Sequence, residues 1–312
     1  MRTGYLRGLL GWGQSVLTYV RQAREVGSVS RLLARVAKWQ TRWLQVPVFV
    51  RTWGFKSPLA HQHRSAGQNY PWRVNDNKSE ELDKIANGYD PSNPSEFFDY
   101  WFKRFEADAV KPWLRGENVL ELGGATGESA FLISPFCERY LIVEGSPFNC
   151  EVISRRLPSV EVVEAFWEDF QPEMQFSDII LFETLEHYSD PVSLLQRCAR
   201  WLRPNGRIHV SVPNGESLHR RVAVAMGMQS SPTEVNQNDS NQGHLRNYSI
   251  STLTSDVAAA GLKVVYSRGL YLKLVPNSMM LEWNEELLRG INEIAEHRIE
   301  DAAELFLVCE IK

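Results

Sequence analysis

The sequence has few cysteines and no long apolar run. Its four cysteines, Cys137, Cys150, Cys198 and Cys309, are scattered, with no CxxC and no Cys/His group at metal-site spacing. That pattern argues against a disulfide framework and against a zinc site, and it predicts no bound metal and a reducing compartment such as the cytoplasm. Because no run reaches about 18 apolar residues, a membrane-spanning helix is not expected.

Acidic residues are almost absent from the first 56 positions, although the whole chain has a net charge of -4. Residues 1–56 hold ten Lys and Arg against one acid, Glu25. An apolar stripe and a basic row recur there at helical spacing and comprise Leu32, Leu33, Val36, Trp39, Trp43, Arg31, Arg35, Lys38 and Arg42. The pattern predicts a basic amphipathic helical extension. Three roles fit it: binding at a membrane surface, packing on the domain or on a second copy in a homodimer, and targeting to an organelle.

Residues 57–92 are polar and rich in turn formers, so they are expected to be a linker. Residues 93–312 are expected to form one domain. From residue 117 its strands and helices are expected to alternate, which is typical of an α/β domain with a parallel sheet. A turn is expected at 203–206, and the polar segment 229–248 is expected to be a lid or substrate loop. The expected strands are 117–122, 140–144, 160–164, 177–183, 206–212, 262–267 and 303–311, with helices near 127–136, 147–157, 190–203, 250–260 and 282–297.

A middle glycine is missing from the glycine-rich turn at 123–127. An apolar strand at 119–122 leads into this turn, and a helix is expected directly after it. The dinucleotide fingerprint G-x-G-x-x-G places a glycine where this chain has Ala125, and Glu121 would repel a pyrophosphate. The turn therefore predicts a nucleoside-containing cofactor other than a nicotinamide dinucleotide. Glu144, at the end of the next strand, is placed to accept hydrogen bonds from ribose hydroxyls.

Four motifs, in order, resemble those of the class I S-adenosylmethionine-dependent methyltransferases. Glu121–Gly127 fits the family pattern E/D-x-G-x-G-x-G except at Ala125. Val143–Ser146 resembles the second motif, Asp178–His187 the fourth-strand motif and Ser211–Asn214 the end of strand five. The resemblance covers about residues 95–312, and its subgroup includes ubiquinone-biosynthesis and natural-product O-methyltransferases. It implies a Rossmann-like, doubly wound, mostly parallel sheet of seven strands, with the last strand antiparallel.

The resemblance also implies S-adenosyl-L-methionine as the cofactor. Glu144 would hold the ribose, and the backbone around Glu183 and Thr184 would border the methyl-transfer face. The acid that accepts from the adenine amino group in the family is replaced by Phe166. Phe166 or Trp167 is then expected either to wall the adenine or to belong to the core, with Glu168 or Asp169 as the fallback acceptor. The expected cofactor-binding residues are Glu121, Gly123, Gly124, Gly127, Glu144, Gly145, Ser146, Phe166, Trp167, Glu168, Glu183 and Thr184.

Three histidines are candidate catalytic residues, since imidazole titrates in the range useful for a general base. His187 follows the fourth strand, His219 follows the fifth, and His244 ends the polar loop. A structural role is the alternative for each of them. Arg220, Arg221 and Arg246 are candidates for holding an acidic group of the substrate, with a solvated surface as their alternative.

The expected activity is methyl transfer to a small-molecule acceptor, most plausibly at a hydroxyl of a natural product, a sugar or a lipid-linked intermediate. A non-catalytic binding or scaffold protein of the same fold, or an N- or C-methyltransferase, is the alternative. A nucleic-acid substrate is disfavoured because the domain after residue 56 has a surplus of acids. The expected location is the cytoplasm, with peripheral membrane attachment through residues 1–56 left open.

Overall fold

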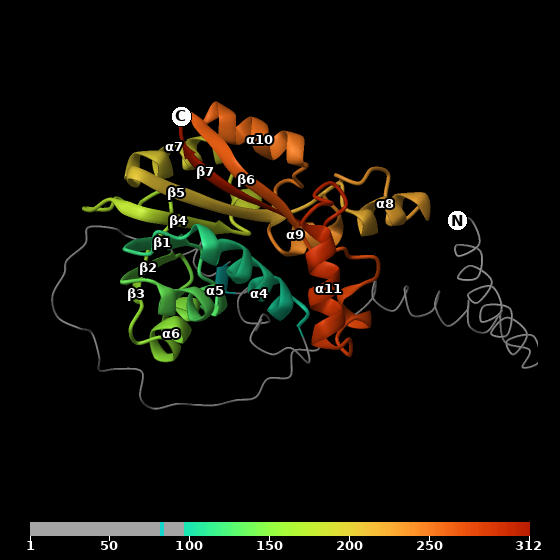
Figure 1. Cartoon of the computed structure of the whole chain (residues 1–312), viewed down its shortest axis with the longest axis horizontal. Coiled ribbons are helices and arrows are strands. Elements are labelled where there is room, and N and C mark those ends of the chain that lie inside the picture. The colour runs from blue at the N-terminus through green and yellow to red at the C-terminus, as the bar shows by residue number, and fades with distance from the viewer. Residues whose placement is uncertain (1–81, 84–96) are drawn as a thin grey trace, which may run out of the picture. The chain divides into compact units, whose positions relative to one another are not determined.

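The computed structural model describes residues 82–83 and 97–312, which form a seven-stranded sheet with helices on both faces (Figure 1). The expected helical extension at 1–56 lies outside the described residues. So does the expected linker at 57–92, apart from Leu82 and Asp83. The domain boundaries at 56 and 92 therefore stay predictions.

The sheet has the strand order β3-β2-β1-β4-β5-β7-β6. The first five strands pair in parallel, whereas β7 is antiparallel to both β5 and β6, as expected. The strand order reverses between β1 and β4, and in open α/β sheets ligands bind outside the carboxyl ends of the strands at that point. The strands are β1 (Asn118–Leu122), β2 (Arg139–Glu144), β3 (Glu161–Glu164), β4 (Phe176–Phe182), β5 (Leu202–Pro213), β6 (Leu262–Leu270) and β7 (Glu304–Ile311).

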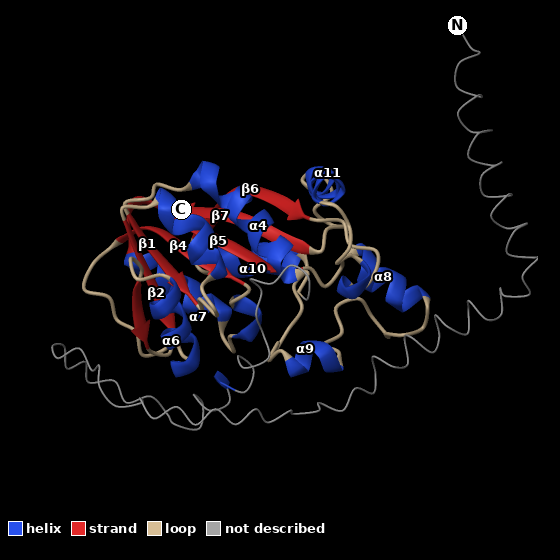
Figure 2. Cartoon of the chain, turned by 90° about the horizontal axis from the view of Figure 1, so that it is seen from below, coloured by secondary structure: helices blue, strands red, loops and turns tan. Residues whose placement is uncertain are grey.

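Helices cover the two faces of the sheet with separate apolar cores (Figures 1 and 2). On one face pack α7 (Pro191–Trp201) and α10 (Ile250–Ala259), and on the other α4 (Asp99–Val110), α5 (Glu128–Ile133), α6 (Pro147–Arg156) and α11 (Glu285–Ala295). α8 (Leu218–Ala225) is a helix that the sequence pattern did not predict, and α9 (Gln237–Asn241) lies inside the expected polar loop. Among the described residues, no helix combines the length and apolarity needed to cross a membrane.

Aromatic packing fixes helix α4 against the sheet. Phe98, Phe102 and Phe105 surround the buried ring of Tyr271, with ring centroids 5.3, 6.0 and 5.7 Å away. Aromatic pairs at such distances contribute about 0.5–1.5 kcal/mol each beyond the area that they bury. The polar side of α4 thereby faces the carboxyl edge of the sheet, where Glu106 reaches Ser211 at the end of β5.

The expected turn at 203–206 is a bulge inside a longer strand. β5 already pairs Leu202 with Phe176, and the ladder resumes with Arg207 opposite Asp178. Asn205, between these pairs, has a φ of +62°, which asparagine tolerates better than most residues. The turn-forming residues therefore act as predicted, but the strand begins at 202 rather than at 206.

Candidate functional site

The glycine-rich turn between β1 and α5 is tied to the end of β2. The Gly123 N–H donates to the Val143 carbonyl over 2.9 Å, and the Ala125 N–H donates to the Glu144 carboxylate over 3.0 Å. Gly123 and Gly127 have φ values of +81° and +80°, and Ala125 has +44°. L-residues reach this region at a cost of about 1–2 kcal/mol, so Ala125 adopts a conformation that a glycine would adopt with less strain.

The glycines of this turn serve different purposes. A Cβ on Gly124 would lie 2.5 Å from Cγ2 of Ile142, so a side chain at this position would collide with the core. A Cβ on Gly123 would lie 3.0 Å from the Trp167 ring and 3.6 Å from Oγ1 of Thr184. Gly123 therefore keeps open the space between the turn, Trp167 and the end of β4.

Glu144 is a buried carboxylate at the carboxyl end of β2. It accepts from the Ala125 N–H and, over 2.8 Å, from the Ser146 N–H. Burial raises the pKa of Glu144, and these backbone hydrogen bonds lower it, with a net shift upward. The carboxylate is thus held rigidly at the position where folds of this type bind a ribose.

The segment Leu82–Asp83 also reaches this edge of the sheet, which the sequence analysis did not foresee. The Ser146 hydroxyl donates to the Asp83 carboxylate, and the Phe148 N–H donates to the same oxygen over 3.3 Å. Ser146 also caps α6 by accepting from the Asn149 N–H. Asp83 therefore places a negative charge at the N-terminus of α6, where the helix dipole favours one.

Phe166, Trp167 and Glu168, which follow β3 and Ala165, occupy different environments. Phe166 is buried, and its ring would lie 3.0 Å from a Cβ on Gly145. Trp167 borders Gly123 and tilts toward Tyr188 at a ring distance of 6.1 Å. Glu168 is exposed, and its carbonyl accepts from Arg197 over 2.8 Å. Phe166 therefore packs at Gly145 after β2, Trp167 borders Gly123 in the glycine-rich turn, and Glu168 is exposed.

Glu121 points into the core on the α4 side of the sheet. It is 2 % exposed and accepts from the Tyr140 hydroxyl over 3.0 Å. Burial raises the pKa of Glu121 to about 7, against the effect of the Tyr140 hydrogen bond and the Lys103 charge. Its carboxylate is therefore held in the core beside the strand that leads into the glycine-rich turn, and its role toward the cofactor stays a prediction.

The raised pKa of Glu121 makes folding depend on pH. Because its pKa is higher in the folded state, this residue destabilises the fold as pH rises from about 4.5 to about 7. Glu121→Gln keeps an acceptor for Tyr140 and removes the titration. We expect the unfolding free energy of Glu121→Gln, relative to that of the natural protein, to increase by on the order of 2–3 kcal/mol as the pH rises across that window. Urea denaturation without cofactor measures it, and a difference constant with pH would contradict the assignment.

Three carboxylates and one ammonium group meet beyond the end of β4. Glu106, Glu183 and Glu304 place carboxylate oxygens within 4.8 Å of one another. Lys103 pairs with Glu106 at 3.0 Å and with Glu183 at 3.3 Å. Burial raises the pKa of Glu106 to about 7, whereas Lys103 and His244 bring the pKa of Glu183 below its usual value despite burial. Burial and the charge of Glu183 raise the pKa of Glu304.

The backbone holds Glu183 in an unusual conformation. Its φ is +51°, and the next residue, Thr184, donates from its hydroxyl to the Leu122 carbonyl over 2.9 Å. Thr184 therefore ties the end of β4 to the end of β1, while the chain turns Glu183 toward Lys103. The sequence motif predicts that the backbone here borders the cofactor, but it gives no sign that the Glu183 side chain belongs to a charged cluster.

Two of the three candidate histidines come together. His187, after β4, and His244, after α9, have ring centroids 4.8 Å apart at 86°. Glu186 completes a group whose ligand-type atoms all lie within 4.8 Å of one another. Burial and the neighbouring His244 lower the pKa of His187 to about 4, which keeps its imidazole neutral near pH 7.

His219 lies elsewhere. Its Nδ1 is 3.1 Å from the Ser217 hydroxyl at the start of α8, and burial lowers its pKa to about 3. The arginines proposed for substrate binding also have internal partners. Arg246 donates to the carbonyls of Tyr188 and Ser189, and the exposed Arg221 pairs with Asp301.

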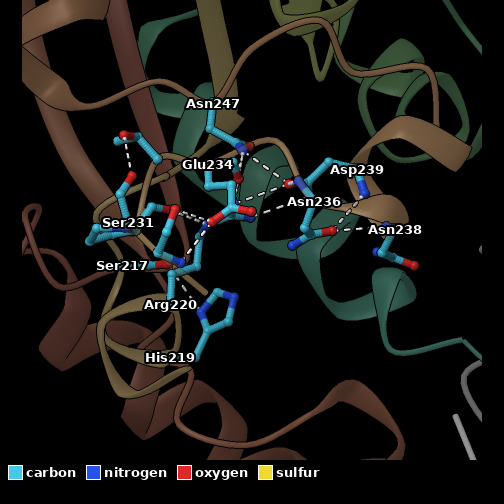
Figure 3. A network of polar contacts seen from close by, with 12 residues as sticks. Ser217, His219, Arg220, Ser231, Glu234, Asn236, Asn238, Asp239 and Asn247 are labelled. Atoms are coloured by element: carbon cyan, nitrogen blue, oxygen red, sulfur yellow. Dashed lines mark hydrogen bonds and ion pairs between the residues drawn. The ribbon is translucent and has the colours of Figure 1, made fainter. Parts of the chain in front are cut away.

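Arg220 fastens the expected lid loop (Figure 3). Its guanidinium forms two hydrogen bonds, of 3.2 and 3.0 Å, with the buried carboxylate of Asp239, and it donates to the carbonyls of Pro232 and Glu234. Asn247 donates to the same carboxylate over 3.0 Å. Arg220 is therefore a structural clamp on residues 232–247 rather than a free cation for a substrate.

Known proteins share this sequence pattern and fold. A family model described as a methyltransferase domain matches residues 88–267. Two proteins named "probable S-adenosylmethionine-dependent methyltransferase" are among the relatives. The one from Mycobacterium tuberculosis is 27% identical over 166 residues, covering 52% of this chain and 58% of its own length. The one from Mycolicibacterium smegmatis is 26% identical over 175 residues, covering 55% and 63%.

The chain therefore spans about three fifths of the length of these relatives. Among solved structures, a Haloferax volcanii methyltransferase in complex with a methyltransferase activator has a TM-score of 0.50 and 16% identity, covering 74% of this chain and 96% of its own. That likeness concerns the fold. Because the family model covers more than half of the sequence, the chain belongs to the methyltransferase-domain family and to the class I S-adenosylmethionine-dependent methyltransferases that its motifs resemble.

Proposed function

We propose that this protein transfers a methyl group from S-adenosyl-L-methionine to a hydroxyl of a small-molecule acceptor. The observation that carries the proposal is the meeting of two sets of residues at the carboxyl edge of the sheet. One set is the glycine turn with Glu144, at the ends of β1 and β2. The other is the polar group of Glu183 and His187, which follow β4, and His244, which follows α9.

The first set fits a nucleoside cofactor. Glu144 is fixed by two backbone N–H groups, and Gly123 and Gly145 leave open the positions that a Cβ would fill beside Trp167 and Phe166. When bound there, S-adenosyl-L-methionine supplies a methyl group on a positively charged sulfur. Because that methyl is already reactive, the protein has mainly to position the acceptor and to remove its proton.

The second set fits an acceptor hydroxyl. His187 is kept neutral, and a neutral imidazole can accept a hydrogen bond from an O–H group. The motif N/D-P-P-Y/F, typical of amide N-methylation within the family, is replaced by Glu183-Thr184-Leu185-Glu186. The sugar, natural-product or lipid-linked nature of the acceptor stays a prediction.

A cationic amine is the second candidate acceptor. The buried Glu106 and Glu304 and the half-buried Glu183 lie together beside the Lys103 ammonium, and the pKa of Glu183 is lowered by that charge and by His244 despite burial. A negatively charged Glu183 can attract a cation. N-methylation of an amine would use the same cofactor site.

The test starts with cofactor binding. Isothermal titration calorimetry of the full-length protein with S-adenosylhomocysteine is expected to detect one site per chain. Glu144→Ala is expected to weaken it by about 10–100-fold, because a hydrogen bond to a charged group contributes about 1.5–3 kcal/mol. Glu161→Ala is the matched control, since it removes an exposed carboxylate from the opposite end of the neighbouring strand.

Methyl transfer is then assayed with a deuterated methyl group and a panel of phenols, sugars, polyols and amines, read by mass spectrometry. Labelling of a hydroxyl compound supports the proposal, and exclusive labelling of amines replaces it with the second candidate. Tight cofactor binding without any transfer across the panel would favour a non-catalytic binding protein. Absence of cofactor binding would contradict the proposed function altogether.

A further inference from the structure

Gly145 is the residue at which a distant segment of the chain reaches the cofactor edge of the sheet. It directly follows Glu144 at the end of β2, and its φ lies outside the left-handed region, so the backbone does not require a glycine here. A Cβ on Gly145 would lie 2.9 Å from Cδ1 of Leu82 and 3.0 Å from Cδ1 of Phe166. Leu82 and Phe166 therefore meet where most residues would carry their own side chain.

Asp83 fixes the position of Leu82. The Asp83 carboxylate accepts from the Ser146 hydroxyl and, over 3.3 Å, from the Phe148 N–H. The N–H of the same Ser146 donates to the Glu144 carboxylate over 2.8 Å. Ser146 thus links the carboxylate beside Leu82 to the carboxylate at the end of β2, and the position of Leu82 is coupled to that of Glu144.

The order of the strands sets the direction in which a nucleoside cofactor lies. With the ribose at Glu144 on β2, the groups proposed for the acceptor follow β4, on the far side of β1. The sulfur that carries the methyl group must therefore extend from the ribose toward β1 and β4. The base is attached on the opposite side of the ribose ring, so it extends toward β3 and α6. Gly145, Leu82 and Phe166 meet on that side.

The side chains at this position suit the flat face of a purine. Phe166 is buried, and Leu82 is half-buried. Both are apolar, and removing the weakly hydrated face of a base from water against such side chains is favourable. Phe166 also replaces the acid that binds the adenine amino group in the family, so apolar packing carries a larger share of base recognition in this chain.

We propose that Leu82 is a cofactor-binding residue that packs on one face of the adenine, in place of the side chain that Gly145 lacks, and that Asp83 is the residue that positions it. The proposal rests on the cofactor placement in the proposed function, but not on the identity of the methyl acceptor. It extends the cofactor site to a segment ahead of residue 88, where the match to the methyltransferase domain begins.

Binding of two ligands to the full-length protein tests the role of Leu82. Calorimetry uses S-adenosylhomocysteine and 5′-methylthioadenosine, which keeps the base, the ribose and the sulfur but lacks the amino acid. Leu82→Ala is expected to weaken both by about tenfold, because part of a leucine contact is lost. Leu82→Met keeps an apolar side chain of similar size and is expected to bind within about twofold of the natural protein. Leu287→Ala, on the exposed side of α11, is the matched control and should bind normally.

Two outcomes would overturn the role of Leu82. A loss confined to S-adenosylhomocysteine would place Leu82 at the amino-acid end of the cofactor instead of at the base. Tighter binding of either ligand by Leu82→Ala would show that Leu82 obstructs the base rather than packing on it.

A second set of variants tests whether Asp83 acts through Leu82. Asp83→Ala is expected to weaken S-adenosylhomocysteine binding by about fivefold. Asp83→Asn should stay within about twofold of the natural protein, because the asparagine oxygen can accept the same two hydrogen bonds. The double variant Leu82→Ala/Asp83→Ala is expected to lose no more than Leu82→Ala does, since residues that act as a unit are not additive. Full additivity, or equal losses in Asp83→Asn and Asp83→Ala, contradicts the positioning role.

Thermal unfolding gives an independent readout of the same contact. S-adenosylhomocysteine is expected to raise the unfolding temperature of Leu82→Ala less than that of Leu287→Ala, because a weaker ligand stabilises the folded state less at equal concentration. An equal rise in both variants overturns the proposal.

Methyl transfer by the same proteins separates this proposal from the proposed function. Weaker cofactor binding by Leu82→Ala, combined with no transfer by the natural protein, keeps the role of Leu82 and removes the proposed function. Unchanged cofactor binding by Leu82→Ala, combined with transfer to a hydroxyl compound by the natural protein, keeps the function and overturns the role of Leu82.

Discussion

Gly123→Val is expected to abolish measurable cofactor binding, with a loss of about a hundredfold or more. Gly123 has a φ of +81°, which a β-branched residue adopts only under strain. Its Cβ would stand 3.0 Å from the Trp167 ring, so Trp167 or the turn itself must move. The turn is fixed to the Glu144 carboxylate through Ala125, so a shift there also displaces the carboxylate that we propose to bind the ribose. Calorimetry with S-adenosylhomocysteine measures the loss.

Gly261→Val is the matched control for backbone strain. Gly261 has a φ of +82°, and a Cβ there would meet no heavy atom within 4 Å. Gly261 directly precedes β6, which is an edge strand of the sheet and is not adjacent to β1, the strand that leads into the glycine-rich turn. Both variants should lose roughly 1–2 kcal/mol of stability from the strained conformation. If Gly261→Val weakened cofactor binding as much as Gly123→Val does, backbone strain alone would explain the loss. The proposal that cofactor binding needs the open space beside Gly123 and Trp167 would then be contradicted.

Arg220→Ala is expected to cost about 3–5 kcal/mol, since it leaves the buried Asp239 carboxylate without its cation. Arg220 also donates hydrogen bonds to the carbonyls of Pro232 and Glu234, so removing its side chain releases the loop that carries His244. Two readouts follow. The urea midpoint should fall, and hydrogen exchange at the amides of His244 and Leu245 should accelerate, because these amides close the loop.

Arg221→Ala gives the comparison on the same helix. Its side chain is 45% exposed, and its partner Asp301 also pairs with Arg298. Exposed pairs of this kind contribute about 0.2–1 kcal/mol. Similar losses from Arg220→Ala and Arg221→Ala would show that the Asp239 pair is not the clamp of the loop. Arg220→Lys is expected to recover little, because lysine cannot form the two-bond contact with the carboxylate.

The features that could be predicted well from the sequence are those that depend on residues close together along the chain. The strand, the glycine turn and Glu144 are recognisable because backbone conformation and apolar runs are local properties. The expected strands were confirmed for the same reason, whereas the antiparallel β7 confirmed what the family resemblance implied. The bulge at Asn205 shows the limit, since turn-forming residues do not reveal whether the strand ladder resumes beyond them.

The features that were missed depend on contacts between distant segments. Lys103 on α4 and Glu304 on β7 meet Glu183 only because the sheet order and the aromatic packing of α4 bring them together. His244 joins His187 because the Arg220 clamp folds the polar loop back over the end of β4. Spacing along the chain carries no signal for such a group. For the same reason, the sequence left Arg220 as a candidate either for holding an acidic group of the substrate or for a solvated surface.

The contact between Asp83 and Ser146 limits where a shortened recombinant version of the protein can begin. The family match begins at residue 88, and the expected domain boundary lies at 92, so a fragment that starts at either position lacks Asp83. Such a fragment keeps all seven strands but loses the Asp83 carboxylate. That carboxylate contacts Ser146 and Phe148 at the start of α6, directly after Glu144 and Gly145. The working unit thus extends past the recognisable domain, and recombinant truncation should begin upstream of Leu82.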